Sequence, residues 1–146
     1  MGRKDTKTGG YRLNVTADTN VLLRAVVGDD AAQASIAAKA LMDADKIAVT
    51  LPCLCEFVWV LLRVYDFKPQ DVAIAIRALT SAANVQVNRF AVEAGLTMLE
   101  AGGDFADGVI EFEGRWLGGD TFVSFDKKAV ALLKAQGLQT KLLSST

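Results

Sequence analysis

Two patterns of apolar and polar residues alternate along the 146-residue chain. Short runs rich in Val, Ile, Leu and Phe are followed by longer stretches with apolar residues every three or four positions, an order typical of strands and amphipathic helices. The short runs predict strands at residues 13–17, 47–50, 84–87 and 121–125, with an edge strand at 140–143. The longer stretches predict helices at residues 20–27, 30–42, 52–65, 69–80, 90–101, 105–117 and 128–136.

This order of elements predicts an α/β fold with a parallel sheet covered by helices on both faces. Local signals mark the ends of several helices. Gly28 and Gly137 stand where helices should end. Asp29 or Asp30 can cap the second helix, and Pro52 suits the first turn of the third.

Length and composition narrow the class of protein. We expect a flexible tail over residues 1–11 and a single domain over residues 12–146. The apolar fraction of 51% is explained either by a generous core or by an apolar face that a partner covers, and the Ala-, Val- and Leu-rich helices favour the second. No apolar run is long enough to span a bilayer, and the first residues lack the apolar centre of a secretory signal, so we expect a cytoplasmic protein.

Charge and cysteine content exclude two further classes of site. The net charge of −1 argues against a basic nucleic-acid-binding surface at the level of the whole chain. Cys53 and Cys55 lie two positions apart in a predicted helix and therefore point in different directions. We expect them to be reduced packing residues rather than a disulfide or a zinc site.

Five carboxylates stand at the ends of predicted strands or the starts of predicted helices: Asp18, Glu56, Asp104, Asp107 and Asp126. Asp18 and Asp126 directly follow strands, and Glu56 lies about one turn into the helix after another strand. The helix that begins near Asp104 leads into the fourth strand, so its start should lie beside the strands' carboxyl ends. We therefore expect all five acids at the edge where open α/β sheets bind ligands.

Because the chain contains no histidine, the commonest general base and zinc ligand is missing. Clustered carboxylates repel one another unless a cation neutralises them, and hard oxygen ligands suit Mg²⁺ or Mn²⁺. The pattern therefore predicts metal-assisted phosphate chemistry.

Helix capping is the simpler explanation for several of these acids. Asp18, Asp104 and Asp126 each precede a predicted helix, and Asp is among the best N-cap residues. Asp104 and Asp107 have the spacing of a capping box. Ligation and capping both stay open for these residues.

Glu56 is surrounded in sequence by apolar residues, which predicts a carboxylate that is costly to desolvate unless it is paired or binds a metal. The alternative to metal binding is an ion pair with Arg63 or Arg24.

Four segments together resemble a known family. ADTNVLL follows the first strand, then come P-x-x-x-E-x-x-W-V-L, DFADGVI and FVSFDKKA, in that order. They resemble the PIN-domain ribonucleases and, more closely, the VapC toxins of bacterial toxin–antitoxin pairs. The similarity extends over residues 14–143. It implies a three-layer α/β/α PIN-like domain with a four- to five-stranded parallel sheet.

The resemblance also implies an activity, a Mg²⁺- or Mn²⁺-dependent endoribonuclease that leaves a 5′-phosphate. Asp18, Asp107 and Asp126 would ligate the ion, and Glu56 would ligate it or orient the attacking water. The remaining positions that match the family are Asp104 as an additional acid, Asn20 and Ser124 as polar residues that orient ligands, and Gly108 where Ala is usual.

Further residues are candidates for contact with RNA. Those that could bind phosphate are Arg24, Arg63, Arg115, Lys127 and Lys128, although a solvated surface role is the simpler expectation for each. Trp59 and Trp116 could stack on bases, but their apolar helical surroundings favour core or interface packing. The resemblance implies a small antitoxin that covers the acids and a homodimer.

Three rival functions stay open. An aspartate-based phosphatase would need a second acid two residues after Asp18, where this chain has Asn20. A receiver-like signalling domain would need paired acids after the first strand and a lysine after the last. The third rival is a catalytically inactive PIN-like RNA-binding or scaffolding protein.

Overall fold

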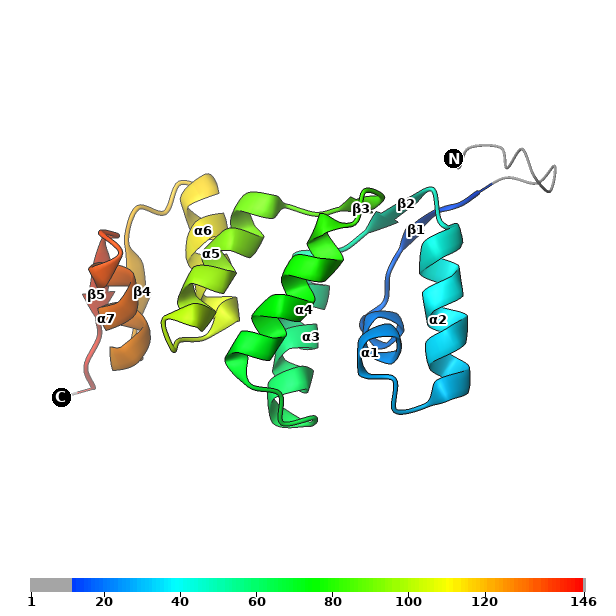
Figure 1. Cartoon of the computed structure of the whole chain (residues 1–146). Helices are drawn as coiled ribbons and strands as arrows, with labels where there is room; N and C mark the ends of the chain where they lie inside the picture. The colour runs from blue at the N-terminus through cyan, green and yellow to red at the C-terminus, as the bar shows by residue number, and fades with distance from the viewer. Residues whose placement is uncertain (1–11, 146) are drawn as a thin grey trace. The chain divides into compact units, whose positions relative to one another are not determined.

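The computed structural model describes residues 12–145, so the tail predicted over residues 1–11 lies outside the described residues (Figure 1). The chain divides into two compact units, one ending at Asn88 and the other beginning at Arg89. We describe each unit by itself. The single domain expected over residues 12–146 stays a prediction.

The first unit alternates strands and helices as the sequence predicts. Its elements are β1 (Asn14–Thr16), α1 (Thr19–Val27), α2 (Ala31–Asp43), β2 (Lys46–Ala48), α3 (Leu51–Arg63), α4 (Pro69–Ser81) and β3 (Val85–Gln86). The strands form a parallel sheet in the order β1-β2-β3, with Ile47 paired to both Val15 and Val85. Parallel pairing requires a crossover between successive strands, and the helices supply it.

The second unit contains a helical hairpin and a small sheet. Its elements are α5 (Arg89–Glu100), α6 (Phe105–Trp116), β4 (Phe122–Ser124), α7 (Lys127–Ala135) and β5 (Thr140–Leu142). β4 and β5 pair in parallel, with Phe122 opposite Thr140, and α7 packs on both strands. The α/β class and the parallel pairing are therefore confirmed. The strands form sheets of three and two, so a single sheet of four to five strands stays a prediction.

Local sequence signals determine where the helices start and stop. Gly28 ends α1 in the left-handed conformation at φ 69°, which glycine adopts readily because it has no Cβ atom. Asp30, rather than Asp29, caps α2 by accepting a hydrogen bond from the Gln33 backbone N–H at 3.0 Å. Pro52 lies in the first turn of α3, where its missing N–H leaves no partner unsatisfied.

The core of the first unit forms beneath α3. Leu54, Phe57 and Leu61 are fully buried and recur at helical spacing, so they form one apolar face. Val72 and Ile76 of α4 are equally buried, and α3 packs against α4.

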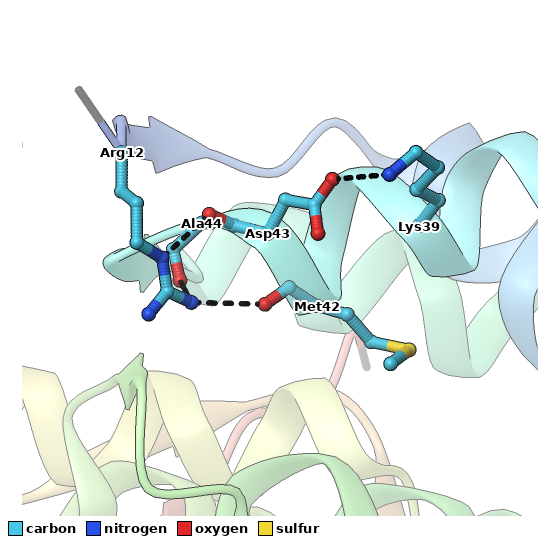
Figure 2. A network of polar contacts seen from close by, with 5 residues as sticks. All are labelled: Arg12, Lys39, Met42, Asp43 and Ala44. Carbon is cyan, nitrogen blue, oxygen red and sulfur yellow. Dashed lines mark hydrogen bonds and ion pairs between the residues drawn. The ribbon is translucent and has the colours of Figure 1, made fainter. Parts of the chain in front are cut away.

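The C-terminus of α2 is closed by side chains from distant parts of the chain. The Arg12 guanidinium donates hydrogen bonds to the carbonyl oxygens of Met42, Asp43 and Ala44 at 3.0–3.2 Å (Figure 2). The Asn84 amide donates to the carbonyls of Leu41 and Ala44, each at 3.2 Å. The last carbonyls of a helix have no partner within the helix, and a cation there also complements the helix dipole. These bonds join the segments that lead into β1 and β3 to one helix end.

The helices α5 and α6 pack with very little space between them. A Cβ atom at Gly108 would overlap the carbonyl oxygen of Ala94 and lie 2.9 Å from Cα of Gly95. A Cβ atom at Gly95 would lie 2.6 Å from the Phe105 ring. Glycine at these positions allows the close approach of the two helices.

We predict that Gly108→Ala lowers the free energy of unfolding by about 1–3 kcal/mol, because the added methyl group must push two backbones apart. Gly114→Ala is the matched control in the same helix, since a Cβ atom there meets nothing within 4 Å. It should raise stability by up to about 1 kcal/mol through helix propensity. Chemical denaturation measures both variants, and equal effects would contradict the close packing.

Candidate functional site

Asp18 lies between β1 and α1 with its side chain exposed to solvent. It occupies the N-cap position of α1, yet its carboxylate accepts no capping hydrogen bond from the described residues. The backbone carbonyl of Asp18 accepts the first bonds of the helix from Val21 and Leu22. Capping therefore does not account for this carboxylate, which stays available for a ligand.

Glu56 is exposed on the solvent-facing side of α3, which corrects the expectation of a costly, apolar environment. The apolar neighbours in sequence lie on the opposite side of the helix, where they form the core. The suggested ion pair with Arg24 or Arg63 is also absent from the described chain, because Arg24 pairs with Asp29 instead. Glu56, Trp59 and Arg63 share the exposed face of α3.

A buried thiol links Asp18 and Glu56 in space. Cys53 is buried and accepts a hydrogen bond from the Thr19 hydroxyl at 3.6 Å. Burial raises the pKa of the Cys53 thiol; the Thr19 bond opposes this, and the charges of Asp18 and Glu56 raise it further. Both carboxylates therefore lie within electrostatic reach of one sulfur atom. Neither cysteine forms a disulfide in the part of the chain that the structure describes. The raised pKa of the Cys53 thiol disfavours the reactive thiolate.

The other three acids belong to the second unit, where two of them cap helices. Asp104 caps α6 by accepting a hydrogen bond from the Asp107 backbone N–H at 3.2 Å. Oδ1 of Asp126 caps α7 by accepting from the backbone N–H groups of Lys128 and Ala129 at 2.9 and 3.0 Å. The capping explanation is thus correct for Asp104 and Asp126. Oδ2 of Asp126 accepts no hydrogen bond from the described residues.

Asp107 is the acid whose environment is least favourable for a negative charge. Its side chain is half-buried in the first turn of α6. Desolvation raises the pKa of Asp107, and the nearby carboxylates of Asp104 and Asp126 raise it further. The carboxylates of Asp104 and Asp126 therefore both lie within electrostatic reach of Asp107.

The polar residues expected to orient ligands have different roles. The Ser124 hydroxyl oxygen accepts a hydrogen bond from the Asp126 backbone N–H at 2.9 Å, so it fixes the backbone of a candidate ligand. Asn20 is exposed in the first turn of α1, next to Thr19. Ser124 thus positions the backbone of Asp126.

The acids therefore form two groups, Asp18 with Glu56 in the first unit and Asp104, Asp107 and Asp126 in the second. Over residues 12–145, no group of three or more Asp, Glu or Cys side chains is arranged to hold a metal ion. The donor chemistry fits a hard cation, since every candidate ligand is a carboxylate. A four-carboxylate metal site stays a prediction.

The candidate phosphate-binding residues are engaged to different degrees. Nη1 of Arg24 pairs with Oδ1 of Asp29 at 2.8 Å, and the Tyr65 hydroxyl donates to the other oxygen of Asp29 at 3.1 Å. Nε of Arg115 pairs with Glu111. The side chains of the other three, Arg63, Lys127 and Lys128, are exposed.

Of the core or interface packing expected for the two tryptophans, core packing is wrong, and interface packing stays a prediction. Trp59 is 57% exposed and Trp116 is 77% exposed. Both occupy the solvent-facing sides of their helices, so base stacking or contact with a partner stays open for each.

The sequence did not predict two of the interactions in this part of the structure. Glu111 is buried within α6 although it is charged, and its only sequence signal is a Glu-to-Arg spacing of four residues. The contact of Tyr65 with Asp29 joins residues 36 positions apart, for which the sequence has no local signal.

Comparison with known proteins adds no family. Neither the protein-family models nor the curated proteins contain a match to this sequence. The resemblance to PIN-domain ribonucleases therefore depends on the four sequence segments alone. Among the described residues, each helix is too short or too polar to span a bilayer.

The raised pKa of Asp107 makes stability depend on pH in a defined direction. The folded state binds a proton at Asp107 more tightly than the unfolded state, whose Asp pKa is about 3.9. Stability contributed by this proton is present below that pKa and is lost as pH rises through the folded pKa. We predict that Asp107→Asn raises the melting temperature at neutral pH and that the gain vanishes in acid.

Thermal unfolding, monitored by circular dichroism at pH values from acidic to neutral, measures the effect on the melting temperature. Glu113→Gln is the control, because it removes one negative charge from an exposed position of the same helix. An equal gain in both variants would show that net charge, rather than the environment of Asp107, is responsible.

Proposed function

We propose that this protein is a metal-dependent endoribonuclease that acts as the toxin of a VapC-type toxin–antitoxin pair. The observation that carries the proposal is the order and spacing of the four acid-containing segments. The structure supports it in part, because Asp18 and Glu56 approach one thiol while Asp107 lies within reach of Asp104 and Asp126.

We extend the proposal to the fold, as a three-layer α/β/α PIN-like domain with one parallel sheet of four to five strands. Two observations support it. Within residues 12–145, the strand pairs in both units are parallel. β1 and β4 also each end shortly before a candidate acid, Asp18 and Asp126 respectively.

In this proposal Asp18, Asp107 and Asp126 ligate Mg²⁺ or Mn²⁺, and Glu56 ligates it or orients water. The bound ion would supply activation of water and charge neutralisation at the phosphate. Ser124 holds the backbone of Asp126, and the hydrogen bonds to Oδ1 fix that carboxylate in place. Asp107 is desolvated in advance, so a cation would relieve an unfavourable charge there.

The proposed partners are RNA as substrate, a small antitoxin and a second copy of the chain in a homodimer, all in the cytoplasm. An arginine of the antitoxin could occupy the place of the cation among carboxylates. Exposed apolar side chains such as Met42, Phe90 and Leu117 support protein partners, because water-exposed apolar surface favours burial.

We predict that Asp18→Asn lowers the rate of Mg²⁺-dependent RNA cleavage at least about a hundredfold, because a ligand charge is lost. Stability should stay within about 0.5 kcal/mol of the wild type, since the Asp18 carboxylate makes no capping bond. Cleavage of total RNA with and without Mg²⁺ or Mn²⁺ measures the first effect, and chemical denaturation measures the second.

Asp66→Asn is the matched control. It removes the same charge from an exposed loop position of the first unit, where φ is 55° and Asn is well tolerated. It should cleave at the wild-type rate. Wild-type activity in Asp18→Asn would refute the metal site, and RNA binding without any cleavage by the wild type would favour the inactive PIN-like alternative.

We also predict that Mg²⁺ raises the melting temperature and releases protons on binding at mildly acidic pH, because it displaces the proton that the raised pKa of Asp107 retains. Calorimetry in buffers of different ionisation enthalpy measures the proton release. Asp107→Asn should bind Mg²⁺ more weakly and release fewer protons. Absence of both effects in the wild type would contradict the site.

A further inference from the structure

The proposed metal site leaves one buried carboxylate of the second unit without a function. The Glu111 side chain is only 7% exposed, although it lies in the middle of α6 and carries a charge. Its Oε2 accepts from Nε of Arg115 at 2.7 Å. Only the carboxylate of this pair is buried. Desolvating a charge offsets much of the Coulombic gain of an ion pair, so stability alone is a weak explanation for this one.

The pair holds the Arg115 guanidinium in a defined orientation. Glu111 engages Nε, and the guanidinium carbon lies 5.4 Å from the centre of the Phe112 ring. Over residues 12–145 neither Nη atom has a hydrogen-bond or ion-pair partner, and the Arg115 side chain is 46% exposed. A guanidinium fixed in this way presents two N–H-bearing nitrogens to solvent, a geometry that suits a phosphate.

The position of this guanidinium relates it to the candidate acids of the same unit. Asp107, Glu111 and Arg115 are spaced by four residues, so they lie on successive turns along one side of α6. Arg115 is therefore about 12 Å along the helix axis from Asp107. Trp116 follows Arg115 in the sequence, and its exposed indole is not part of the core.

We propose that Glu111 is a positioning residue that orients Arg115 to bind a backbone phosphate of single-stranded RNA, with Trp116 stacking on an unpaired base. This inference rests on the proposed function and identifies the form of its substrate. The chemistry is complementary, since the guanidinium matches a phosphate and the aromatic face matches a base that is free of a duplex.

The experiment measures binding of a short fluorescent oligouridine to the full chain by anisotropy, in EDTA to prevent cleavage and over a range of salt concentrations. Arg115→Gln should raise Kd about tenfold, through loss of one charged hydrogen-bonding contact. It should also reduce the slope of log K against log salt by about 0.7, the value for one phosphate contact on a single strand. Arg115→Lys should restore the slope but not the affinity, because Lys lacks the planar fork.

Lys134→Gln is the matched control for charge, since it removes one cation from the last turn of α7 in the same unit. It should leave affinity for the oligouridine near the wild-type value. Trp116→Ala should weaken binding of single-stranded RNA about fivefold or more and leave duplex RNA unaffected.

A comparison at position 111 isolates the positioning role from the charge. Glu111→Gln and Glu111→Met both remove the negative charge, but only Gln keeps an oxygen that can accept from Nε of Arg115. The Gln variant should bind the oligouridine severalfold more tightly than the Met variant. Equal affinities would overturn the positioning role. If the Glu111 carboxylate were merely structural, both variants would lower the melting temperature, and their affinities for the oligouridine would not differ.

Arg115→Gln leaves the buried Glu111 carboxylate without its cation, which could destabilise the fold. The double variant Glu111→Gln/Arg115→Gln removes both charges and is therefore measured as well. It should share the binding defect. Wild-type affinity in a folded double variant would overturn the inference. So would variants of Arg115 and Trp116 that abolish self-association while leaving RNA binding unchanged, since the face would then join two copies of the chain.

The cleavage assay separates this inference from the proposed function. RNA binding that depends on Arg115, in a protein that shows no Mg²⁺-dependent cleavage, would support the inference and refute the nuclease. Cleavage that is insensitive to all Arg115 variants, with unchanged RNA binding, would overturn the inference and leave the nuclease standing.

Discussion

Parallel pairing of β1 with β2 is the constraint on which the position of the first two acids depends. With Thr16 opposite Ala48, both strands end at the same edge of the sheet. Asp18 follows the first strand at that edge, and the helix that carries Glu56 begins there after the second. Antiparallel strands would have placed these two carboxylates at opposite edges. The shared influence of both acids on Cys53 follows from this register.

In the second unit, carboxylates combine helix capping with availability to a cation. Asp126 uses one oxygen to cap α7 and keeps the other free of hydrogen bonds from the described residues. Asp104 caps α6 while its charge raises the pKa of Asp107. Capping stabilises the helices, whereas crowding of the acids destabilises the folded state at neutral pH. In the proposed site, a cation would remove the second effect without disturbing the first.

The sequence predicts those parts of the fold that depend on neighbouring residues. Gly28, Asp30 and Pro52 act within one helical turn, so the helix ends they mark agree closely with the structure. The prediction of an apolar environment for Glu56 was wrong, because that environment depends on how α3 is rotated about its axis. Apolar neighbours in sequence are not neighbours in space when each residue turns the helix by about 100°. Whether the acids of the two units meet at one ion depends on contacts that no short segment encodes.

The environment of Glu111 depends on the tertiary structure rather than on its neighbours in the sequence. A glutamate four residues before an arginine is ordinarily a solvated surface pair of little consequence. Burial changes this, because a desolvated carboxylate favours keeping its cation in one place. The fixed guanidinium of Arg115 then differs from the exposed Lys127 and Lys128, which must be ordered by any phosphate that they bind. In the proposed function, the residue best prepared to bind an RNA phosphate is therefore Arg115, which another side chain already holds in place.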